Sequence, residues 1–150
     1  MNITLNHKDN QFVFLLNLIL EFAMERLPGN IRLYNHALEI LHLSRNISDY
    51  LGYDLTELKN DGSEDLNIYF TGDIIRHSDS LAPEIKKAEM HPFQDQRLKH
   101  ADSVSKLSQR LYKTCVRLER AESNGKDFIK VLRREVKKFN RLQRKWALTL

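Results

Sequence analysis

The chain has 150 residues, of which 41% are hydrophobic and 29% are charged, and its net charge is +4. A chain of this length can bury about two-thirds of its unfolded surface as one domain, without a disulfide or a metal site. Five glycines, three prolines and a single cysteine favour helices over strands and argue against global disorder and a disulfide framework. The composition therefore predicts a single all-α domain over residues 1–150.

Charge is distributed unevenly along the chain. Residues 1–94 hold 8 Lys and Arg against 14 Asp and Glu, a net charge of −6, whereas residues 95–150 hold 16 against 6, a net charge of +10. Such a split is typical of a protein whose basic part binds a polyanion, although an acidic part can also dock on a basic part of the same molecule. We therefore distinguish an acidic helical half, 1–94, from a basic helical half, 95–150.

The first predicted helix is apolar on more than one side. Large apolar residues recur between residues 12 and 23, before a Leu-Pro-Gly-Asn turn at residues 27–30. The apolar run is too short to cross a membrane and carries Asn17 and Glu21, and it lacks the basic leader and cleavage site of a signal peptide. We expect this helix either to lie in the core or to be half covered by a second subunit. We expect the protein to be cytoplasmic and not to bind membranes.

Four shorter helical segments are predicted between this turn and His91-Pro92, where the chain should break. Their apolar spacing and N-caps place them at residues 31–45, 54–60, 64–81 and 83–89. Gly72 is expected to weaken the third segment, in which residues 68–71 also fit a strand, and Pro83 is expected to begin the fourth. The sequence Asn60-Asp61-Gly62-Ser63 is typical of a loop.

Two long helices are predicted after the break, over residues 95–122 and 126–146, and the short connection Ser123-Asn124-Gly125 makes them an antiparallel hairpin. The apolar stripe of the first contains Val104, Leu107, Leu111, Cys115 and Leu118. That of the second contains Phe128, Val131, Leu132, Val136, Phe139, Leu142 and Trp146. Both stripes should face the core, which makes Cys115 a small buried hydrophobic residue and not a nucleophile.

Cations occupy the opposite faces of both predicted helices. The candidate nucleic-acid contacts on the last helix are Lys130, Arg133, Arg134, Lys137, Lys138, Arg141, Arg144 and Lys145. Those on the preceding helix are Lys106, Arg110, Lys113 and Arg117. We expect these side chains to bind the phosphate backbone of RNA or DNA without reading base sequence, in a small subunit or accessory factor of a nucleoprotein complex with other protein subunits.

Two other interpretations of the basic faces stay open. They can be ordinary solvated surfaces, or they can dock on an acidic protein, with the apolar first helix making a homo-oligomer. Tyr112 lies at the border of its stripe and could contact either the core or a ligand.

No catalytic residue, metal ligand or cofactor is predicted, so we expect a protein that is not an enzyme. Glu39 and His42 have the E-x-x-H spacing of di-iron carboxylate bundles, but the second E-x-x-H of such sites is missing. The sequence from His36 to Glu39 resembles the phosphorylated helix of His-phosphotransfer bundles, without the Lys-Gly that follows there. His77, His91 and His100 are expected to be surface or capping residues.

Overall fold

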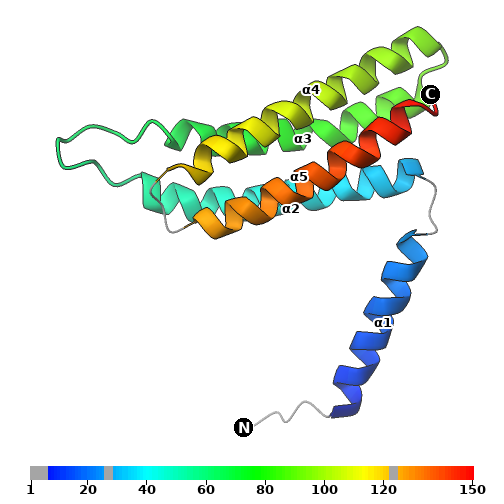
Figure 1. The fold of residues 1–150 in the computed structure, drawn as a ribbon, viewed down its shortest axis with the longest axis horizontal. Coiled ribbons are helices and arrows are strands. Elements are labelled where there is room, and N and C mark those ends of the chain that lie inside the picture. The colour runs from blue at the N-terminus through cyan, green and yellow to red at the C-terminus, as the bar shows by residue number, and fades with distance from the viewer. Residues whose placement is uncertain (1–6, 26–28, 122–124) are drawn as a thin grey trace.

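The structure is a computed structural model that describes residues 7–25, 29–121 and 125–150. These residues contain five helices and no strand, which confirms the predicted all-α class (Figure 1). The helices are α1 (His7–Glu25), α2 (Gly29–Leu55), α3 (Ile68–Met90), α4 (Gln94–Glu119) and α5 (Lys126–Ala147). Helices α2 to α5 run alternately up and down and form a four-helix bundle in which each helix contacts two neighbours.

All four bundle helices contribute to one hydrophobic core. Fully buried large side chains come from α2 (Leu33, Ile40, Leu51), α3 (Ile74, Leu81, Ile85), α4 (Val104, Leu111, Leu118) and α5 (Ile129, Leu132, Phe139). Within each helix they lie three, four, seven or eleven residues apart, which are whole numbers of helical turns to within a fraction of a turn, so that each helix turns one apolar stripe inward.

Buried hydroxyls line the contact between α2 and α3. The Ser78 hydroxyl donates to the Ile74 carbonyl, so the Ser44 hydroxyl, 2.7 Å away, is the donor to Ser78. The Ser48 hydroxyl donates to the Thr71 carbonyl over 2.8 Å. Ser48 therefore lies inside α2 and bonds across to α3.

Helix α2 is longer than predicted. The chain stays helical beyond residue 45 because Ile47, Leu51 and Leu55 continue its buried stripe. The predicted helix at residues 54–60 is wrong, since the chain leaves the helix after Leu55 and residues 56–67 connect α2 to α3. The predicted loop at residues 60–63 lies in this connection and is confirmed.

Helix α3 joins two segments that the sequence had separated, and the strand alternative for residues 68–71 is wrong. Pro83 lies inside this helix, although proline removes a helical hydrogen bond. Buried Ala82 and Ile85 on either side of it keep the segment packed on the bundle. The predicted break at His91-Pro92 is confirmed. The N-terminal helices of the bundle are therefore as long as the basic ones, and not short as predicted.

Helix α1 lies apart from the bundle, so the prediction of a core helix is wrong (Figure 1). Its large apolar side chains from Phe12 to Leu20 are 44–67% exposed. The reason is that α2 to α5 already close on one another and fill the core between them. None of the helices that the structure describes is long and apolar enough to cross a membrane.

Candidate nucleic-acid interface

Helix α5 lies between α2 and α4 and buries the arc that faces both. The predicted burial of Leu132, Val136, Phe139 and Trp146 is confirmed, and Leu142 is partly buried. Phe128 and Val131 were predicted wrongly, since they are 49% and 44% exposed, and the Phe128 ring packs edge-on against Tyr50. The buried arc is rotated from the predicted stripe and includes Ile129 and Gln143 in their place.

The opposite face of α5 is cationic, as the sequence predicted. Five exposed residues on it form no ion pair with any acidic residue that the structure describes, and we call them the outer strip: Arg134, Lys137, Arg141, Arg144 and Lys145. At about 1.5 Å of rise per residue, the outer strip extends over roughly 16 Å of one straight helix. Lys130 and Lys138 share the face but pair with Asp127 (3.6 Å) and Glu135 (2.8 Å).

Arg133, a predicted contact, lies where α4 meets α5. Its Nε atom is 2.8 Å from Oε2 of Glu119, and its side chain is 30% exposed. The neighbouring Glu119 carboxylate and Tyr112 hydroxyl raise the pKa of Arg133. Arg133 and the half-buried Tyr112 therefore join the two helices, and they are less available to a ligand than the outer strip.

Three of the four candidate cations of α4 lie beside residues of α3. The Arg117 guanidinium lies 4.1 Å from the centre of the Phe70 ring. Lys106 and Arg110 line a hollow of about 300 Å³ together with Ser80 and Glu84 of α3, and Lys106 pairs with the aspartate one turn before it (2.6 Å). Lys113 is exposed. The cations of α4 and α5 therefore form two separate surfaces.

The histidines that raised enzymatic alternatives have structural contacts. Nε2 of His36 lies 3.1 Å from Oε2 of Glu135, and the side chain is 12% exposed at the contact between α2 and α5. His42 contacts Asn46 on its own helix. Within the described residues, no three His, Cys, Asp or Glu side chains come together in a way that could hold a metal ion.

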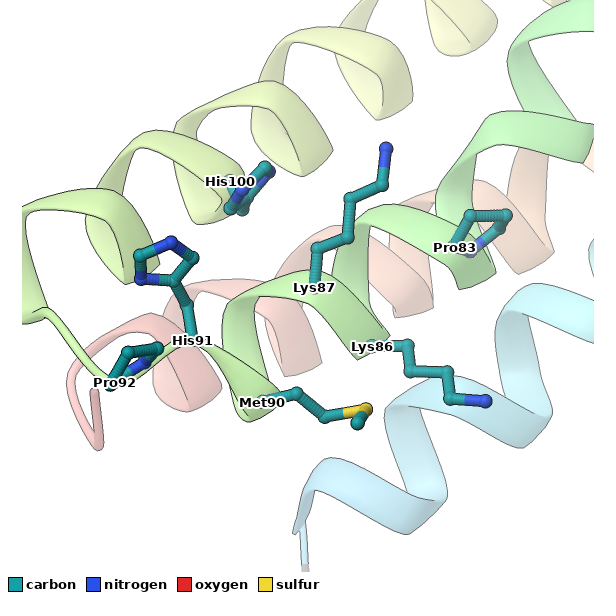
Figure 2. Close-up of a pocket in the computed structure, with 7 residues that line it drawn as sticks. All are labelled: Pro83, Lys86, Lys87, Met90, His91, Pro92 and His100. Carbon is teal, nitrogen blue, oxygen red and sulfur yellow. The ribbon is translucent and has the colours of Figure 1, made fainter.

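A hollow at the end of the bundle was not foreseen from the sequence (Figure 2). It has a volume of about 460 Å³, and we call it the end hollow: Pro83, Lys86, Lys87, Met90, His91, Pro92 and His100. His100, which was expected to be a surface or capping residue, is partly exposed, and its Nδ1 atom lies 2.7 Å from Oε2 of Glu84. The sequence signal was the break at His91-Pro92, which brings the start of α4 beside the end of α3.

Cys115 is fully buried, which confirms its predicted place in the core. Burial, assisted by the negative charge of Glu119, raises the pKa of the Cys115 thiol to about 12. A thiol with this pKa is protonated at neutral pH, and only the thiolate is nucleophilic.

The chain matches no protein-family model, no curated protein and no solved structure. The functional inference therefore rests on the surfaces of this chain alone.

Proposed function

We propose that this protein binds the phosphate backbone of RNA or DNA through the outer strip of α5. The observation that carries the proposal is the run of five exposed cations without an acidic partner among the described residues. Like charges at i,i+3 and i,i+4 destabilise a helix. An anionic ligand along the strip would remove this repulsion.

The dimensions of the strip suit a nucleic-acid backbone. Each strand of a duplex presents one phosphate per about 3.4 Å along its axis, so the roughly 16 Å of the strip corresponds to roughly five phosphates. Three of the five cations are arginines, which can bind phosphate oxygens with two parallel hydrogen bonds. Contacts of this kind carry no base information, so we expect binding that is largely independent of sequence.

The core holds the strip in place. Phe139 and Trp146 are buried on the opposite side of the same helix, and the Trp146 indole N–H donates to Glu89 of α3. A ligand therefore meets cations on a preformed helix, and binding does not require the backbone of α5 to become ordered. The α4 cations face another direction, so we expect them to add less affinity than the outer strip.

Fluorescence anisotropy tests the proposal with labelled single-stranded RNA, single-stranded DNA and duplex DNA of matched length, each at several salt concentrations. Five phosphate contacts predict a slope of log affinity against log salt of about −4.5 for duplex DNA and about −3.5 for single strands. Lys137→Glu/Arg141→Glu should abolish binding while circular dichroism shows unchanged helicity. The control Lys59→Glu/Lys99→Glu makes the same charge change at exposed positions off the strip and should retain most of the binding. Unchanged binding by the strip variant, or no binding of any ligand at low salt, would contradict the proposal.

A second candidate function is docking on an acidic protein. It is favoured by the exposed apolar side chains of Phe128 and Val131 on the same helix as the cations, since protein interfaces combine an apolar centre with a charged rim. Such docking should depend much less on salt than phosphate binding does. Val131→Ser would weaken it and leave nucleic-acid binding unchanged, which separates the two functions.

A further inference from the structure

Helix α1 exposes more apolar surface than a monomer in water normally does. Eight large side chains are exposed along it: Phe12, Val13, Phe14, Leu15, Leu16, Leu18, Ile19 and Leu20. Eight side chains of this size, each about half exposed, offer roughly 600–800 Å² of apolar surface, close to the approximately 800 Å² per partner that a standard interface buries. Monomers rarely expose a continuous apolar patch of this size.

The end hollow offers a matching surface at the end of the bundle from which α1 departs. The turn between α3 and α4, the start of α2 and the C terminus lie at this end (Figure 1). Figure 2 shows Met90, His91 and Pro92 where α3 ends and the chain turns towards α4, and Met90 is 71% exposed. Phe93, which is 66% exposed and packs its ring beside that of His91, extends the exposed apolar surface next to it.

The charges of the two surfaces are complementary. Lys86 and Lys87 line the end hollow, and Glu84 pairs with only one of these two lysines. Between residues 11 and 25, the only charged residues of α1 are Glu21 and Glu25. A helix whose apolar run ends in two carboxylates fits an apolar hollow that is lined by ammonium groups.

We propose that the protein forms a two-fold symmetric dimer in which α1 of each copy docks in the end hollow of the other. One hollow covers only one side of a helix, whereas α1 is apolar on several sides. In a two-fold dimer the two α1 helices also pack on one another, so that a second side is covered. A helix lying flat on a lipid surface has a polar face that is usually rich in Lys and Arg. The polar residues from Asn10 to Glu25 of α1 share one narrow face, but none of them is a cation.

The solution mass tests the dimer and its two surfaces. Light scattering of the full chain should give about twice the 17.7 kDa of one copy. Ile19→Lys on α1 and Met90→Lys at the end hollow change exposed residues, and each should weaken dimerisation at least about 30-fold, as expected for a central interface residue. The control Tyr53→Lys changes a residue that is 87% exposed elsewhere on α2 and should leave the mass unchanged. A monomeric parent chain, or a dimer that survives Met90→Lys, would overturn the proposal.

Cross-linking shows which copy supplies α1. In the variant Ile19→Cys/Met90→Cys, a flexible bis-maleimide should join two chains, while the buried Cys115 does not react. Cross-links only within one chain would show that α1 folds back on its own bundle, and no cross-link would show that the surfaces do not meet. Both results overturn the proposal, as would flotation with phosphatidylcholine and phosphatidylserine vesicles that is lost in Ile19→Lys.

The proposed dimer and the proposed nucleic-acid binding can be tested independently of one another. Lys137→Glu/Arg141→Glu should keep the dimer mass, and Met90→Lys should keep the salt slope of each copy.

Discussion

Helices α1 and α5 have similar lengths, 19 and 22 residues, but α1 lies apart from the bundle and α5 packs in it. The more apolar helix, α1, exposes every large apolar side chain from Phe12 to Leu20. The more charged helix, α5, buries Phe139 and Trp146 in the core. The difference teaches that the number of apolar residues does not decide burial. A helix packs on a bundle when its apolar residues share one arc that matches two neighbours, and α5 meets this condition.

The largest expected effect tests whether the position of a residue on the buried arc of α5, and not its type, determines how much it contributes to the stability of the fold. Phe139→Ala should lower the free energy of unfolding by about 3–5 kcal/mol, because it removes a fully buried ring and leaves a cavity. Phe128→Ala, on the same helix but 49% exposed, should cost about 1 kcal/mol or less. Urea unfolding followed by circular dichroism measures both. Equal losses would mean that the two rings contribute alike and that the arc is assigned wrongly.

A smaller effect is expected where α5 joins the bundle. Gly125 precedes α5 and is buried, and a Cβ atom there would overlap Cδ2 of Leu51 and lie 3.1 Å from its Cγ atom. Gly125→Ala should therefore destabilise the fold by about 1–3 kcal/mol. The control Gly72→Ala adds a Cβ inside α3, where no atom lies within 4 Å, and should stabilise by about 0.5–1 kcal/mol. Thermal unfolding should show shifts of opposite sign, and shifts of the same sign would contradict the close contact.

The smallest effect concerns pH. Burial raises the pKa of Glu135, but its hydrogen bonds and charge interactions with Lys138 and His36 outweigh burial, so the folded pKa lies below the ordinary 4.5. The stability that Glu135 adds is therefore present above about pH 4.5 and is lost as the pH falls through the folded value.

Glu135→Gln should consequently cost less than about 1 kcal/mol at pH 7, and the difference from the parent should shrink towards pH 3. The control Asp127→Asn removes one carboxylate of the same helix at a residue whose side chain is 91% exposed, and it leaves the contact of Glu135 with His36 and Lys138 in place. Urea midpoints at several pH values provide the measurement. A cost of Glu135→Gln that grows towards low pH would contradict the lowered pKa of Glu135.

Much of the bundle could be predicted because α4 and α5 have strong helical periodicity. Their observed bounds lie close to the predicted ones, and their stripes include the buried Val104, Leu111 and Phe139. Helix α2 was divided wrongly because residues that can cap a helix inside it were taken as the start of a new one. Helix α3 was divided wrongly because Pro83 is locally unfavourable inside a helix. Packing across the bundle offsets this local cost, and no single segment of sequence reveals such packing.

The candidate site shows the same limit. Exposure of Lys137 and Arg141 could be predicted, because these residues lie opposite the apolar stripe of their own helix. The contacts of Arg133 with Glu119 and of Arg117 with Phe70 could not, since each joins two different helices. The isolation of α1 was also hidden, because periodicity shows that a helix is apolar but not which surface covers it.

The hydrogen bonds of the serine hydroxyls between α2 and α3 fix the register of these two helices along their axes. If α3 slid along α2 by one helical turn, about 5.4 Å, Ser44 and Ser48 would lose their acceptors on α3. Each buried hydroxyl without a partner costs about 1–3 kcal/mol, whereas apolar side chains tolerate sliding more readily. This pair of helices should therefore resist shear more than the others and set the register of the bundle.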